Sequence, residues 1–103
     1  MYKLCFYVPK THVETVKDAV FEAGAGQIGH YDRCSWEVAG RGQFRPLPGS
    51  QPFLGEANQT EVVEEMRVEM VVAKERIQAV IQALKAAHPF ETPAYDVMEV
   101  IDL

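Results

Sequence analysis

A run of alternating apolar and charged residues at positions 61–72 constrains the fold most strongly. Apolar side chains recur there at every second position, with glutamate or arginine at most of the positions between them; the apolar residues are Met66, Val68, Met70 and Val72. This period of two predicts a β-strand with one apolar and one charged face. Over 74–87, apolar residues recur three and four positions apart, which predicts an amphipathic helix. A strand of this kind followed by such a helix indicates a sheet that helices cover on one side.

The first quarter of the chain shows the same order of strand and helix. Residues 2–8 alternate in the same way and are rich in β-forming side chains, so they predict the first strand. Apolar residues at helical spacing predict a helix over about 12–23. Thr11 and Glu14 have the spacing of a capping box at its start, and Gly24 stands where a left-handed C-terminal cap is favoured.

The middle of the chain is less regular. Residues 30–39 are bounded by glycines and predict a second strand, in which Cys34 and Trp36 share one face. Residues 40–58 are rich in proline and glycine and keep neither period, which predicts a long loop. Within it, 43–47 are predicted to pair back on the second strand as a short hairpin. Loops of this length inside a compact domain are commonly functional.

The residues from 88 to 96 join the second helix to a predicted fourth strand over 95–101. Pro89 and Pro93 lie four positions apart in this join and restrict its backbone. The residue before Pro89 is kept out of the α region, so the second helix is expected to end there. Because the join is stiff, its polar side chains are expected to point in few directions, as a binding site requires.

Taken together, the order strand, helix, strand, loop, strand, helix, strand predicts an α+β fold. It is the order of the ferredoxin-like (split βαβ) arrangement, an antiparallel sheet with two helices on one face. A chain of 103 residues has room for one hydrophobic core. We therefore expect a single domain over 1–103, with a long loop at about 40–60.

Composition argues against two classes of partner. Ten basic and fifteen acidic residues give a net charge of −5, so a nucleic acid would find no basic surface. No run of 18 apolar residues is present, and the start of the chain does not resemble a signal peptide. We expect a cytoplasmic protein with no membrane partner, in which Cys5 and Cys34 are reduced thiols.

Five side chains are candidates for binding an anionic small molecule. Arg41 and Arg45 stand beside flexible glycines in an otherwise acidic chain, and guanidinium groups with nearby backbone amides can hold an anion. Trp36 precedes them, and His88 and Glu91 lie in the stiff join. No catalytic residue and no cofactor are assigned.

The same segment also has a structural interpretation. The glycines would only turn a hairpin, while the arginines would pair with Glu65 or Glu69. Trp36 would be an anchor of the core or of an interface, as expected for an aromatic residue in an acidic protein.

A second set of residues offers ligands for a divalent metal ion. His30, Cys34, His88 and Glu91 are ligand types for a soft or borderline metal, but no two have the spacing of a closed structural site. A histidine that ends a helix and a packed thiol are the competing structural roles.

Several motifs together resemble a known family. They are Gly29-His30-Tyr31, Cys34-Ser35-Trp36, Gly40-Arg41-Gly42-Gln43-Phe44, Glu65 with Glu69, and the join from His88 to Asp96. Over most of the chain these motifs resemble the central inserted domain of the NIF-three-like (YqfO) proteins, here without its flanking domains. The join is also similar to the His-Pro-Tyr-Glu-x-Pro stretch of the CutA divalent-cation-tolerance proteins, trimeric members of the PII-like group. Phe90 replaces the usual tyrosine of that stretch.

This resemblance implies a PII-like, trimeric binding domain in which the long loop is an effector loop. In the full NIF-three-like proteins a pair of metal ions is bound by the flanking domains, so the hydrolase label of that family is not expected to apply here. We expect a homo-oligomeric small-molecule-binding or regulatory module without its own catalysis. The alternative is a divalent-metal-binding protein of the CutA type or a small metal-dependent enzyme.

The predicted sheet also favours self-association. Its face away from the helices would combine Cys5 and Tyr7 with charged groups of the third strand, and such a mixed face can close against copies of itself. The third strand is longer than the first, so its overhang offers an edge for pairing. We expect a homotrimer with the loop 40–58 near a subunit boundary.

Overall fold

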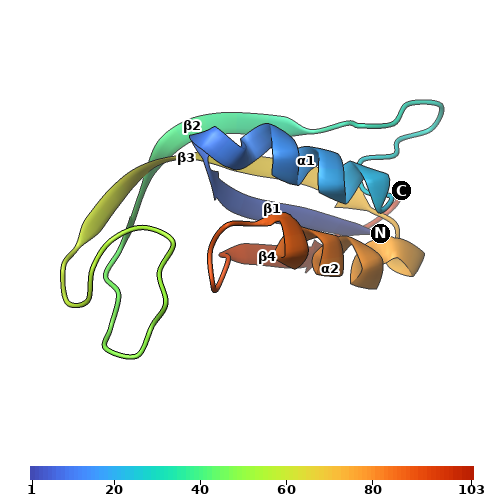
Figure 1. Ribbon diagram of the computed structural model, residues 1–103. Coiled ribbons are helices and arrows are strands. Elements are labelled where there is room, and N and C mark those ends of the chain that lie inside the picture. The colour runs from blue at the N-terminus through green and yellow to red at the C-terminus, as the bar shows by residue number, and fades with distance from the viewer.

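Four strands form one antiparallel sheet in the order β2-β3-β1-β4, and two helices cover one of its faces (Figure 1). The computed structural model describes all 103 residues. Its elements are β1 (Tyr2–Pro9), α1 (Val13–Glu22), β2 (Trp36–Phe44), β3 (Glu61–Val72), α2 (Ile77–Ala87) and β4 (Tyr95–Glu99), with 3₁₀ turns at Lys10–His12 and Lys74–Arg76 before the helices. The predicted ferredoxin-like α+β fold is confirmed.

The hydrophobic core lies between the helices and the inner face of β1 and β3. In the antiparallel register, Leu4 lies opposite Met70 and Phe6 lies opposite Val68. All four are buried, as are the apolar side chains that α1 and α2 turn toward them: Val13, Val16, Val20, Val80 and Leu84. Burying a side chain of this size stabilises a fold by about 1.5–3 kcal/mol. The two alternating patterns therefore assign the inner face correctly.

The hairpin of β2 and β3 extends beyond the rest of the sheet. β1 pairs with β3 only from Glu65 onward, so residues 61–64 pair with β2 alone. Figure 1 shows the hairpin curving away from the helices, and the loop that connects its strands bends back below it. The predicted overhang of the third strand is therefore present.

The second strand is displaced from its predicted position. It was expected at 30–39 but runs from Trp36 to Phe44, so 40–44 belong to a strand and not to the loop. The neighbouring strand explains this position, because each residue of 36–44 pairs with one residue of 61–69 in β3. The predicted short hairpin at 43–47 is wrong, since Gln43 and Phe44 end β2 and the loop covers 45–60.

Residues 30–35 fold back toward α1 instead of extending. The Cys34 N–H donates to the Gly26 carbonyl, and the Gly26 N–H donates to Val71 of β3. Arg33 takes a left-handed φ of 55°. Cys34 therefore does not share a strand face with Trp36, as was predicted.

Of the two caps predicted for the first helix, one is wrong and one is confirmed. The predicted capping box is wrong, because the chain enters α1 through the 3₁₀ turn and His12 is the N-cap, without a side-chain cap bond. The Thr11 hydroxyl forms a hydrogen bond with His12 Nδ1 at 2.8 Å instead. The glycine cap is confirmed, because Gly24 adopts a φ of 111° that favours glycine.

Near the C-terminus, α2 ends at Ala87 and His88 is extended, as the following proline predicts. β4 ends at Glu99, two residues earlier than expected. Neither helix has the length and the apolar composition that crossing a bilayer demands.

Candidate functional site

A cavity of about 490 Å³ lies where the end of β2, the loop 45–60 and the join 88–94 meet. The loop follows β2 directly, whereas the join lies about thirty residues further along the chain; all three lie on the same side of the molecule in Figure 1. The cavity is lined by Tyr7, Gly42, Gln43, Phe44, Arg45, Pro46, Leu47, Ser50, Pro52, Phe53, Glu65, Phe90, Glu91, Thr92 and Ala94. Its volume is in the range of about 300–1,000 Å³ that is typical of small-molecule sites.

Three phenylalanines from three segments form one wall. Phe90 of the join lies with its ring centroid 5.7 Å from that of Phe44 in β2 and 6.4 Å from that of Phe53 in the loop. The Phe53 and His12 rings also pack nearly perpendicular to each other, with their centroids 5.3 Å apart. Aromatic contacts at these separations are favourable, so they help to hold the loop against the join.

Hydrogen bonds of His88 hold Phe90 in this wall. Its Nδ1 accepts a hydrogen bond from the Phe90 N–H at 3.1 Å, so Nε2 carries the proton and donates to the Tyr7 carbonyl at 2.7 Å. Burial lowers the pKa of His88, the Tyr7 carbonyl raises it, and nearby His12 lowers it further. His88 is thus a buried, neutral side chain with both nitrogens bonded, which positions Phe90.

Glu91 connects the join to the loop. Its Oε2 accepts a hydrogen bond from the Gln51 N–H at 3.2 Å. This bond and the phenylalanine contacts hold together two segments that border the cavity and share no backbone pairing.

Glu65 is the site residue that the sequence patterns did not single out as a ligand group. It lines the cavity and also a second hollow of about 290 Å³. A Cβ at Gly42 would overlap its carboxylate, so the side chain lies directly on that glycine. Burial raises the pKa of Glu65. No protein group forms a hydrogen bond or an ion pair with its carboxylate.

The two arginines lie next to this region. Arg45 lines the cavity and Arg41 lines the second hollow. Both are exposed, and neither is within ion-pair distance of a carboxylate. The structural interpretation that paired them with Glu65 or Glu69 is wrong, because Glu69 pairs with Arg67 at 3.1 Å and Glu65 has no partner.

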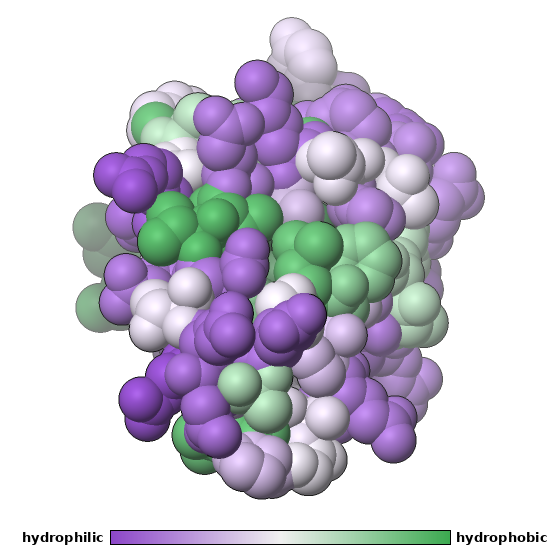
Figure 2. Space-filling model, turned by 60° about the vertical axis from the view of Figure 1, so that its left-hand side comes forward, coloured by the Kyte–Doolittle hydropathy of each residue, from purple (hydrophilic) through white to green (hydrophobic).

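Trp36 does not line the cavity. It lies opposite Glu69 on the sheet face without helices and is 62% exposed. Val38 and Met98 are also exposed on that face. Figure 2, seen from the side of the β2–β3 hairpin, shows apolar side chains gathered in patches that hydrophilic groups surround.

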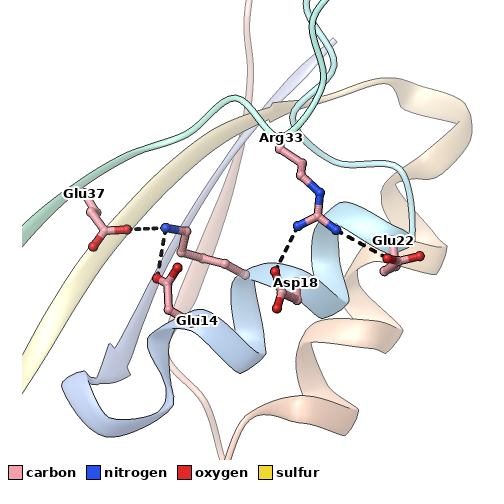
Figure 3. A network of polar contacts seen from close by, with 6 residues as sticks. Glu14, Asp18, Glu22, Arg33 and Glu37 are labelled. Carbon is pink, nitrogen blue, oxygen red and sulfur yellow. Dashed lines mark hydrogen bonds and ion pairs between the residues drawn. The ribbon is translucent and has the colours of Figure 1, made fainter.

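Ion pairs hold the segment before β2 on α1. Arg33 bonds to Asp18 at 2.9 Å and to Glu22 at 3.3 Å, both on α1 (Figure 3). Lys17 of α1 bonds to Glu37 of β2 at 2.7 Å and to Glu14 at 3.1 Å. Burial lowers the pKa of Lys17, but these two carboxylates raise it above its usual value.

This arrangement separates the candidate metal ligands. His30 and Cys34 lie in the segment held on α1, whereas His88 and Glu91 lie beside the cavity. The Cys34 thiol donates a hydrogen bond to the Asp32 carbonyl, with a distance of 3.7 Å between sulfur and oxygen. No three side chains of the metal-ligating types converge within one chain.

Comparisons with known proteins agree with the fold and with the resemblance. No family model matches the sequence. A GTP cyclohydrolase 1 type 2 homolog of Mycobacterium leprae is 48% identical over 99 residues, which are 96% of this chain and 26% of that protein. A Bacillus cereus protein related to NIF3 superposes with a TM-score of 0.83 and 39% identity over 98% of this chain and 26% of its own.

The structure of CutA1 from Pyrococcus horikoshii covers 100% of this chain and 86% of its own, with a TM-score of 0.71 and 14% identity, which bears on the fold alone. The chain is thus a module with a CutA-like α+β fold. Its sequence is similar to one region of the NIF3-related proteins, and it spans about a quarter of the length of the curated relatives that it matches.

Proposed function

We propose that the chain is a cytoplasmic, homo-oligomeric module that binds a small anionic effector and has no catalysis of its own. The observation that carries this proposal is the cavity of about 490 Å³ between β2, the loop and the join. An effector held there would contact the loop and the join at once, so its binding would change how the two segments pack.

The lining of the cavity supports an effector with an apolar, flat part and an anionic part. Phe44, Phe53 and Phe90 offer ring faces and edges to the flat part. Arg45 has no carboxylate partner, so its guanidinium is free to bind a phosphate or carboxylate in a two-point fork. Arg41 adds a second positive charge nearby.

Self-association is supported by the sheet face without helices. It exposes Trp36 and Met98 beside charged groups such as Arg67, and an isolated chain would leave this surface in water. The hairpin overhang at 61–64 leaves one edge of β3 without a partner strand. Three copies in a ring would cover both features, so we propose a homotrimer with the loop near the subunit boundary.

Calorimetry of the protein against a panel of nucleotides and phosphorylated metabolites tests the effector. Changing Arg41→Ala together with Arg45→Ala should abolish binding and leave the circular dichroism spectrum unchanged. Arg76→Ala, an exposed arginine in the 3₁₀ turn before α2, is the matched control and should bind as the wild type does. Equal affinity of the wild type and the double variant would refute the proposal.

A further inference from the structure

We propose that Glu65, lying on Gly42, is the specificity-determining residue of the cavity and receives two adjacent N–H donors of a planar heteroaromatic ligand. This inference rests on the proposed function and adds the chemical class of the ligand. It assigns one end of the ligand to Glu65 and leaves the anionic substituent to Arg45.

The sequence around Glu65 builds a place for its carboxylate. Gly40 lies directly opposite Glu65 in the β2–β3 ladder, and Gly42 is the next residue of β2 on the same face. A side chain at Gly42 would occupy the position that the carboxylate takes. The carboxylate thus rests on bare backbone between the two hollows, where a ligand in the larger one can reach it.

Glu65 also differs from Glu91, the other carboxylate that lines the cavity. Glu91 already accepts the Gln51 N–H, and Arg67 is paired with Glu69. Burial raises the pKa of Glu65, and no arginine or lysine lies within ion-pair distance of its carboxylate. Because no protein group donates to the Glu65 carboxylate, its oxygens are able to accept hydrogen bonds from a ligand in the cavity.

The carboxylate and its neighbours indicate which donors a ligand would present to Glu65. An ionised carboxylate only accepts hydrogen bonds, and its two oxygens match two parallel N–H groups. The three phenylalanine rings favour a flat aromatic partner over an aliphatic amine. A ring N–H beside an exocyclic amino group has this donor pattern in one plane.

A matched pair of probes isolates this contact. Guanosine 5′-monophosphate and inosine 5′-monophosphate share the phosphate, the sugar and the ring N–H, and differ by the exocyclic amine. By calorimetry, the wild type should bind the guanosine compound about tenfold to a hundredfold more tightly, as expected for one hydrogen bond to a charged group. Glu65→Gln should bind both compounds equally, because an amide offers a single acceptor.

Two control variants separate this inference from the proposed function. Glu64→Gln changes the neighbouring, exposed carboxylate, which does not line the cavity, and should keep the wild-type preference. Arg45→Ala should weaken both probes by a similar factor, since both carry the phosphate. Binding of the inosine compound by Glu65→Gln shows that this variant is folded.

Three results would overturn the assignment of Glu65. They are equal binding of the two probes by the wild type, an unchanged preference in Glu65→Gln, and binding of neither probe. A changed assembly mass in Glu65→Gln with an unchanged preference would place Glu65 in a subunit contact instead. If the preference is absent while Arg45→Ala still weakens both probes, the inference fails and the proposed function stands.

Discussion

Replacing His88 by alanine tests whether the buried imidazole holds the join in place. His88 is 6% exposed, and its two nitrogens bond to the Tyr7 carbonyl at 2.7 Å and to the Phe90 N–H at 3.1 Å. The variant removes both bonds and leaves the Tyr7 and Phe90 groups without these partners. Phe90, which contacts Phe44 and Phe53, loses its support.

The expected loss of stability follows from these contacts. A buried polar group left without a partner costs about 1–3 kcal/mol. Two such groups, both partly buried, together with the space left by the ring, predict a loss of about 2–4 kcal/mol for His88→Ala. His30→Ala, at an exposed position, should change the free energy of unfolding by less than about 0.5 kcal/mol.

The loss should also depend on pH. Burial lowers the pKa of His88 in the folded chain, whereas an unfolded chain has a histidine pKa of about 6.5. Below that value the unfolded state binds the proton more readily, so the contribution of His88 is complete above pH 6.5 and declines as pH falls through the folded pKa. Protonation would also turn Nδ1 into a donor that cannot accept the Phe90 N–H.

Urea unfolding followed by far-ultraviolet circular dichroism measures both effects. The difference in stability between the wild type and His88→Ala should be largest at pH 7.5 and smaller at pH 5.5. The other titratable groups are the same in both proteins, so their effects on stability cancel in that difference. A loss below about 0.5 kcal/mol at pH 7.5, or a difference that does not shrink at pH 5.5, would refute the role given to His88.

Three further outcomes are expected. Elemental analysis of the purified protein should find less than one tightly held transition metal per chain, since the four candidate ligands are divided between two separate parts of the structure. Stoichiometric zinc or copper that His88→Ala loses would favour the metal-binding alternative. Light scattering coupled to size exclusion should give three times the chain mass of 11.6 kDa, whereas a single chain mass would contradict self-association and a dimer the threefold arrangement. Gly42→Ala should displace Glu65 and weaken binding of guanosine 5′-monophosphate, while Gly40→Ala, where a Cβ meets no atom, should not.

The inner faces of the first and third strands and the end of the second helix were predictable from the sequence. Apolar periods of two and of 3.6 are local properties, so Leu4, Phe6, Val68 and Met70 could be assigned to one buried face before their partners were known. The end of α2 was predictable for a similar reason, because Pro89 restricts only the residue before it.

The position of the second strand was not predictable in this way. The glycines at 40 and 42 are typical of a loop, yet they lie in β2 because β3 supplies a paired edge. Cross-strand pairing joins Gly40 to Glu65 and Gly42 to Val63, which are distant in the sequence, and no local pattern contains that information.

Some residues of the candidate site were also predictable from the sequence, and others were not. Residue types and the stiff join were enough to indicate Arg45 and Glu91, both of which line the cavity. Tertiary structure alone brings Phe44, Phe53 and Phe90 into one wall, and it alone leaves Glu65 without a partner. The physical reason is that chemical type and period belong to each segment, whereas burial, pairing and desolvation arise only when distant segments pack together.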